Sequence, residues 1–245
     1  MEEILYHYTS HNALLGIVQS KSMWASNIHF LNDIKEFTHA IDETKALIWN
    51  RKKAQSHPNL AALYGGLESS LESISKVNIF IVSFTEMGDQ LSQWRGYCPN
   101  GAGCSIGFAK SAILTLAKQQ DFILKPCIYD WPHQLRLLEG LLEHAERIAT
   151  TQNALDNVVD RAIDTFLNEL IELAPLLKHR AFAEEREWRL VSGLVANTDS
   201  RWRTRAGTAN LIPYIEFCLV GNDDPMPIRN VVVGPGPEKA LASDA

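Results

Sequence analysis

Three short stretches of the sequence combine side chains that can bind or transform a small molecule. The first is His7-Tyr8-Thr9, which lies in a run rich in β-forming residues. Because side chains alternate along a strand, His7 and Thr9 share one face, from which they can hydrogen-bond a ribose or an amide. A core histidine satisfied by the backbone is the alternative interpretation of His7.

The second stretch runs from Gly88 to Phe108, between two apolar runs, and holds Trp94, Arg95 and Tyr97 among several glycines. Flat aromatic faces, a fixed charge and a backbone that can approach a ligand closely are typical of a pocket wall. We therefore interpret this stretch as a glycine-rich connection that forms one wall of a pocket. The alternative is that Trp94 fills a gap in the core and Arg95 forms a structural ion pair.

The third stretch is Glu184-Glu185-Arg186-Glu187-Trp188-Arg189. On a strand, Glu187 and Arg189 share one face, whereas Trp188 points to the other. A carboxylate held by a neighbouring cation can stabilise positive charge that develops in a substrate. A solvated strand edge is the alternative interpretation.

The rest of the sequence carries no other catalytic signature. It contains no Gly-x-Ser-x-Gly, no Walker loop, no His-Glu-x-x-His and no carboxylate-rich metal motif. Cysteines 98, 104, 127 and 218 lack the Cys-x-x-Cys spacing, so we expect neither a metal site nor a disulfide framework.

Composition and charge exclude several classes of protein. The chain of 245 residues is 46% hydrophobic and 21% charged, which is ordinary for a globular protein with a real core. Its net charge of −6 argues against a broad nucleic-acid groove. The cluster Arg201, Arg203 and Arg205 is the one stretch suited to a phosphate backbone, with a solvated loop as the alternative.

No apolar run approaches the roughly 20 residues of a membrane span, and the acidic N-terminus predicts no secretory signal, so we expect a cytoplasmic protein.

Hydrophobic periodicity predicts strands and helices whose distribution favours an α+β fold over a regularly alternating parallel sheet. We predict strands at 5–9, 23–26, 78–85, 104–108, 122–129, 182–192, 211–220 and 228–233 and helices at 14–18, 34–51, 60–74, 110–119, 132–145 and 155–173, with Asn32-Asp33 as a turn or cap pair. The strand at 104–108 is expected to pair with the strand at 78–85. We predict a single domain over 1–245, with a helical insertion at about 132–178.

Taken in chain order, several motifs resemble the bacterial family named domain of unknown function 2971. They are Leu5-Tyr-His-Tyr-Thr, the segment 15–26, Asn32-Asp-Ile-Lys-Glu, Val82-Ser-Phe-Thr, Leu91-Ser-Gln-Trp-Arg-Gly-Tyr, Gly103-Cys-Ser-Ile-Gly-Phe, Glu185-Arg-Glu-Trp-Arg and Val232-Val-Gly-Pro. The resemblance spans nearly the whole chain, and the Ser-Gln-Trp-Arg-x-Tyr block is its most specific part.

The family pattern in turn looks like a diverged ADP-ribosyltransferase, which implies a split β-sheet that grips NAD as substrate. That resemblance implies that His7 and Thr9 contact a ribose and the nicotinamide amide, and that Glu187 binds the nicotinamide ribose. It leaves Trp94 or Tyr97 as the stacking aromatic, Arg95 as the pyrophosphate contact, and Ser83, Trp94 and Tyr97 as candidates for the middle position of the triad. Which of Glu184, Glu185 and Glu187 is catalytic stays open.

Three functions compete at this point. The first is an NAD-consuming ADP-ribosyltransferase, a bacterial toxin or phage-defence effector that modifies a nucleic acid or a protein. The second is a non-catalytic nucleotide- or partner-binding module, and the third is a nuclease or phosphotransfer enzyme that uses His7 and Arg95. The expected partners are NAD or a related nucleotide and an unidentified acceptor macromolecule, with homo-oligomer formation left open.

Overall fold

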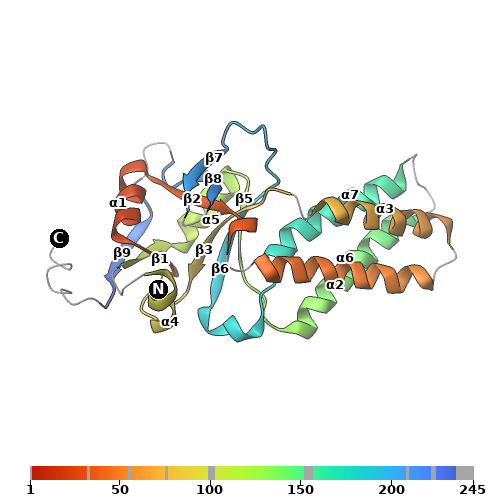
Figure 1. Cartoon of the computed structure of the whole chain (residues 1–245), viewed down its shortest axis with the longest axis horizontal. Helices are drawn as coiled ribbons and strands as arrows, with labels where there is room; N and C mark the ends of the chain where they lie inside the picture. The colour runs from red at the N-terminus through yellow and green to blue at the C-terminus, as the bar shows by residue number, and fades with distance from the viewer. Residues whose placement is uncertain are drawn as a thin grey trace.

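The computed structural model of the chain describes residues 2–31, 34–54, 57–74, 77–98, 103–151, 157–207, 210–221 and 225–235. The predicted pair Asn32-Asp33 and the middle of the glycine-rich stretch, residues 99–102, lie outside the described residues. Figure 1 shows a sheet with its covering helices at one end and a group of long helices that projects from the other.

The observed elements follow the predicted order closely. The strands are β1 (Ile4–Thr9), β2 (Ser22–Asn27), β3 (Phe80–Thr85), β4 (Cys104–Ala109), β5 (Phe122–Pro126), β6 (Glu187–Ser192), β7 (Arg203–Ala206), β8 (Leu211–Cys218) and β9 (Ile228–Val233). The helices are α1 (His11–Ser20), α2 (Ile34–Lys53), α3 (Pro58–Ile74), α4 (Leu91–Tyr97), α5 (Lys110–Gln119), α6 (Trp131–Ala149) and α7 (Val158–Leu173), with short 3-10 helices η1 (Ile28–Phe30), η3 (Ala174–Leu176) and η4 (Arg180–Glu185).

The nine strands form one sheet, and all their pairings are antiparallel. The α+β class is therefore confirmed. Strand β4 pairs with β1 and β9, so the prediction that residues 104–108 pair with β3 was wrong. The chain leaves β3 through α4 and returns to the far side of β1, a crossing that hydrophobic periodicity does not encode.

Strand β3 lies at a division of the sheet. One of its edges pairs with β6 along Ile81–Thr85. The other edge is shared, because Phe80 and Ile81 pair with β2, whereas Thr85 pairs with Tyr6 of β1. Strands β1 and β2 therefore separate along this edge, and the described residues include no strand partner for its middle.

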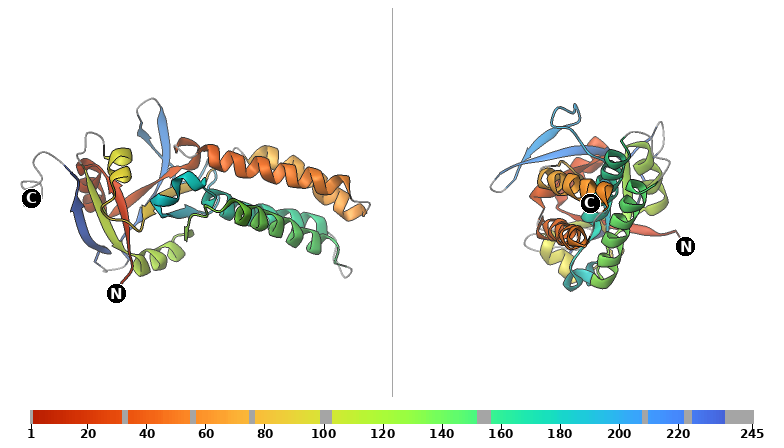
Figure 2. Two further views of the ribbon diagram at one scale, coloured as in Figure 1. Left: turned by 90° about the horizontal axis from the view of Figure 1, so that it is seen from below. Right: turned by 90° about the vertical axis from the view of Figure 1, so that its right-hand side faces the viewer.

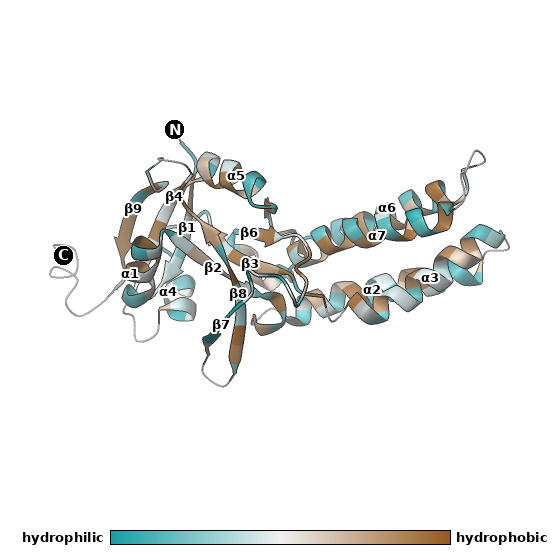
Figure 3. Cartoon of the chain, turned by 90° about the horizontal axis from the view of Figure 1, so that it is seen from above, coloured by the Kyte–Doolittle hydropathy of each residue, from teal (hydrophilic) through white to brown (hydrophobic). Residues whose placement is uncertain are grey.

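Four helices that come from two separate parts of the chain make one apolar cluster, which extends to Ile81 and Val191 of the sheet. Helices α2 and α3 precede β3, whereas α6 and α7 follow β5, and their buried faces share one core. Figure 2 shows the two pairs running side by side, and Figure 3 shows apolar residues on their facing sides. The predicted insertion at about 132–178 is thus one half of a bundle to which residues 34–74 contribute the other half.

A second core joins the sheet to α1 and α5. The helix α1 begins at His11, where the Ser10 hydroxyl caps it by accepting a hydrogen bond from the Ala13 amide. All four cysteines are free thiols. Within the part of the chain that the structure describes, no helix combines the length and the apolarity that a membrane crossing requires.

Candidate functional site

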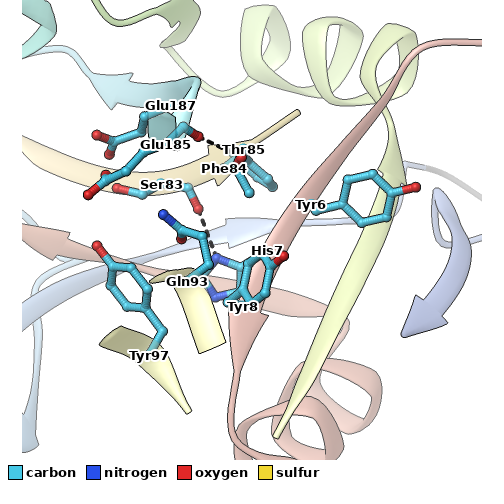
Figure 4. A pocket seen from close by; sticks show the side chains of 10 residues that line it. All are labelled: Tyr6, His7, Tyr8, Ser83, Phe84, Thr85, Gln93, Tyr97, Glu185 and Glu187. Atoms are coloured by element: carbon cyan, nitrogen blue, oxygen red, sulfur yellow. Dashed lines mark hydrogen bonds between the residues drawn. The ribbon is translucent and has the colours of Figure 1, made fainter. Parts of the chain in front are cut away.

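A pocket opens where β1 and β3 separate, and Figure 4 shows the side chains around it. Its lining residues come from β1, β3, α4 and the segment that leads into β6: Tyr6, His7, Tyr8, Ser83, Phe84, Thr85, Gln93, Tyr97, Glu185 and Glu187. The free volume is about 40 Å³, little more than a water molecule occupies. We call this site the split pocket.

His7 sits at the division of the sheet. Its Nδ1 lies 2.9 Å from the backbone oxygen of Ser83, in the middle of the shared β3 edge. Because a carbonyl oxygen only accepts, Nδ1 carries the proton in this contact. Burial lowers the pKa of His7, although the hydrogen bond to Ser83 acts in the opposite direction. The ring is therefore neutral at pH 7, and Nε2 keeps a lone pair that can accept a hydrogen bond from a ligand.

The stretch predicted as a glycine-rich connection contains a helix instead. Helix α4 is fixed to β1 by Tyr8, whose hydroxyl donates to the Met87 oxygen and accepts from the Gln90 amide, both at 2.8 Å. The Trp94 ring packs edge-on against the Tyr8 ring, with ring centroids 4.6 Å apart. Gly88, which precedes α4, lets the backbone lie close to β1, because a Cβ at this position would lie 2.5 Å from the Tyr6 ring.

Helical geometry decides which side chains of α4 face the split pocket. Gln93 and Tyr97 are four residues apart, so they lie on one face, and both line the pocket. Gln93 is 7% exposed, and none of the described residues is hydrogen-bonded to its side-chain amide. In Figure 4 its amide lies between the His7 ring and Tyr97. Its hydrogen-bonding groups are therefore available to a ligand that enters the pocket.

Glu187 begins β6 and is held by two cations. Arg189 donates from Nε to Oε1 at 2.9 Å and from Nη2 to Oε2 at 3.1 Å, and the Lys178 ammonium lies 2.7 Å from Oε2. Burial acts to raise the pKa of Glu187, but these charges and hydrogen bonds outweigh it and hold the pKa at about 2. The predicted pairing of Glu187 with Arg189 on one strand face is confirmed.

Lys178 joins a second carboxylate to this network, since its ammonium also lies 2.6 Å from Oε2 of Glu185. The Lys178 side chain is 1% exposed and that of Glu185 17% exposed. Two carboxylates and two cations therefore meet behind the pocket, and their formal charges cancel. Arg189 is fixed further by a bond from Nη1 to the Pro175 oxygen at 2.6 Å.

The segment before β6 differs from the prediction. Residues 182–185 were expected in the strand, but they belong to η4, and Arg186 has a left-handed backbone with φ of 42°. This turn lets Glu185 and Glu187 line the same pocket although only Glu187 belongs to the strand. Glu184 is exposed and does not line the pocket.

The predicted site residues divide into two groups. His7, Ser83, Tyr97 and Glu187 line the split pocket. Trp94 is 2% exposed in the core, with its indole NH bonded to Asp89, and Arg95 is exposed on the outer face of α4. Thr9 is buried at the end of β1, outside the pocket lining.

Sequence reasoning missed Gln93 and Lys178. The i, i+4 spacing of Gln93 and Tyr97 would have shown their common face if the stretch had been recognised as a helix. Lys178 follows the end of η3 in an irregular segment, and no spacing or motif marks it. Among the described residues, no group of three or more His, Cys, Asp or Glu could hold a metal ion.

Comparison with known families identifies one domain. Residues 93–190 match the family described as "Protein of unknown function (DUF2971)". The likeness to this family is shown for residues 93–190 of the chain. The matched region starts at Gln93 and ends just past Arg189, so it includes α4 from Gln93 onward, Lys178 and both pocket carboxylates. No curated protein matches the chain, no solved structure matches it, and no likeness to ADP-ribosyltransferases emerges from these comparisons.

Proposed function

We propose that the chain binds NAD in the split pocket and cleaves the bond between nicotinamide and ribose, as an ADP-ribosyltransferase does. One observation carries the proposal. A neutral His7, the Gln93 amide without a described partner, the Tyr97 ring and two carboxylates, drawn from four separate segments, line one pocket where the sheet divides. A carboxamide on an aromatic ring is a ligand that a buried glutamine amide and an aromatic face complement.

The chemistry assigned to this site needs no metal. The bond between C1′ and the pyridine nitrogen breaks, and its electron pair leaves with nicotinamide. The C1′ centre becomes oxocarbenium-like, so a carboxylate aimed at it lowers the barrier. An acceptor nucleophile then bonds to C1′ and loses its proton to solvent.

The two carboxylates are suited to different roles. Both oxygens of Glu187 are engaged by Arg189 and Lys178, which fits a positioning role. The side chain of Glu185 is 17% exposed, whereas that of Glu187 is 5% exposed. This greater exposure suits Glu185 to face the ribose. Tyr97 is 43% exposed at the pocket, so its ring can move aside and admit the nicotinamide ring.

The test is release of nicotinamide from NAD, measured with water alone and with a desalted bacterial extract as the source of acceptors. We expect Glu185→Gln to lower the rate by about 10²–10³, the usual loss when one such electrostatic contact is removed. Glu184→Gln is the matched control, because this neighbouring carboxylate lies outside the pocket lining. Equal rates for wild type and Glu185→Gln would refute the proposal.

A second candidate function is a nucleotide-binding module without turnover. The cancelled charges of Glu185, Glu187, Lys178 and Arg189 favour it. Saturable NAD binding that is lost in Gln93→Leu, with no nicotinamide release under any condition, would establish this function in place of the first.

A further inference from the structure

A second and larger cavity lies where the helical bundle meets the sheet. Its free volume is about 470 Å³, within the range of small-molecule sites. The lining comes from α2, from Tyr129 and the start of α6, and from the segment after η3 together with η4; it includes Lys35, His39, Trp131, Lys178, Arg180 and Phe182. We call it the junction cavity.

The charged side chains that line the junction cavity are cationic. They are Lys35, Lys178 and Arg180, and none of its described lining residues is acidic. Lys178 is matched by the carboxylates behind the split pocket, so the field at the mouth comes from the exposed Lys35 and Arg180. In a chain with a net charge of −6, this is a local reversal that attracts an anion.

The same cavity presents flat apolar surfaces from two elements. Trp131 opens α6 and is stacked on His39 of α2, with ring centroids 5.0 Å apart and planes inclined by 19°. Phe182 of η4 is 39% exposed, and the Lys178 ammonium lies 5.0 Å from its ring centre. Aromatic rings on separate elements beside exposed cations suit a ligand that is planar at one end and anionic at the other.

We infer that the junction cavity binds a nucleotide, with the base against Trp131 and Phe182 and the phosphate facing Lys35 and Arg180. The planar guanidinium of Arg180 matches two phosphate oxygens at once, and Lys35 adds a mobile point charge. This site is separate from the split pocket and does not depend on the NAD chemistry proposed there. Lys178 touches both, since its side chain lines the junction cavity while its ammonium holds Glu185 and Glu187.

Isothermal titration of the full chain with AMP, GMP, CMP and UMP, each in turn, tests the inference. We expect at least one of them to bind, and adenosine or inorganic phosphate alone to bind at least tenfold more weakly than AMP if AMP is the ligand. The double substitution Lys35→Gln with Arg180→Gln is expected to weaken binding at least tenfold, and Phe182→Ala several-fold. All three side chains are exposed, so the fold tolerates these changes.

Control substitutions show whether a nucleotide binds in the junction cavity or elsewhere on the protein. Lys45→Gln on α2 and Arg136→Gln on α6 remove exposed cations outside the cavity lining, and they are expected to leave binding unchanged. Gln93→Leu alters the lining of the split pocket and is likewise expected to have no effect here. The inference is overturned if no mononucleotide binds more tightly than about 1 mM, or if Gln93→Leu abolishes binding while the Lys35 and Arg180 pair does not.

Discussion

Gln93 and Gln134 are the two glutamines buried in the described part of the chain, and each lines one of the two pockets. At the junction cavity, the Gln134 amide donates to the backbone oxygens of Ile128 and Lys178, at 2.5 and 2.9 Å. At the split pocket, the Gln93 amide has no partner among the described residues. The first glutamine ties segments of the protein together, whereas the second presents its hydrogen-bonding groups to whatever enters the pocket.

The comparison shows that two buried glutamines in one fold can serve different purposes, one in structure and one in recognition. Burial is nearly equal for the two side chains, 7% and 5% exposed, so exposure alone would not distinguish them. Hydrogen bonding does, because the Gln134 amide donates to two backbone oxygens, whereas the Gln93 side chain faces the split pocket. The network of Lys178, Arg189 and the two carboxylates connects the two pockets, because Lys178 lines the junction cavity and its carboxylate partners line the split pocket.

The largest expected effect on stability comes from breaking the ion-pair network around Lys178 and Arg189. Arg189→Met leaves Glu187 buried with one of its two cations removed, and a broken buried ion pair costs about 3–5 kcal/mol. Arg229→Met is the matched control, because its pair with Glu2 is exposed and such pairs contribute little to stability. Urea unfolding of both variants measures the difference. Equal losses would show that the network is no more important than a surface pair.

Acid should weaken the same ion-pair network in the wild-type protein. The pKa of Glu187 is held at about 2, below its ordinary value of 4.5, so its contribution to stability is present above pH 4.5 and is lost as the pH falls toward 2. The corresponding change in unfolding free energy is about 3 kcal/mol. Chemical denaturation between pH 6 and 2 measures it.

Glu187→Gln is the reference for that titration, because it removes the titrating group while nearly keeping the shape of the side chain. Its stability should be lower at neutral pH and should fall less steeply below pH 4.5. A slope identical to that of the wild type would assign the acid sensitivity to other carboxylates.

The two glutamines themselves give the next largest contrast. Gln134→Leu leaves the Ile128 and Lys178 oxygens without their donor and is expected to cost about 1–3 kcal/mol. Gln93→Leu removes an amide without a described partner and should be neutral or slightly stabilising, while it abolishes ligand binding at the split pocket. Paired thermal melts and NAD titrations test this. A destabilised Gln93→Leu would mean that its amide supports the fold.

The smallest stability effect is expected at Tyr97. Its side chain is 43% exposed, so Tyr97→Ala should change the unfolding free energy by less than about 0.5 kcal/mol. NAD affinity should fall nonetheless, because the pocket loses its exposed aromatic face. Tyr97→Phe keeps the ring and should retain most of the affinity; if it binds as weakly as Tyr97→Ala, the hydroxyl and not the ring carries the contact.

Much of the fold could be predicted from local pattern. Alternation and helical periodicity located nearly every strand and long helix, because these signals depend only on neighbours along the chain. The pairing of Glu187 with Arg189 was equally accessible, since residues two apart share a strand face. The short helix α4 was missed, because the glycines around it indicate a connection and its stability comes from Tyr8 and Trp94 packing on each other.

The split pocket itself required the assembled molecule. Nothing in the chain order indicates that β4 lies beyond β1, that β1 and β2 share one edge of β3, or that residues 34–74 complete the bundle of α6 and α7. Those pairings bring His7, Gln93 and Glu187 together, and they bury Lys178 against two carboxylates. Residue types and spacing were enough to nominate His7, Tyr97 and Glu187. Long-range packing buried Trp94 in the core, left Arg95 outside and placed Gln93 in the pocket, because contacts between distant segments are set by the whole sheet.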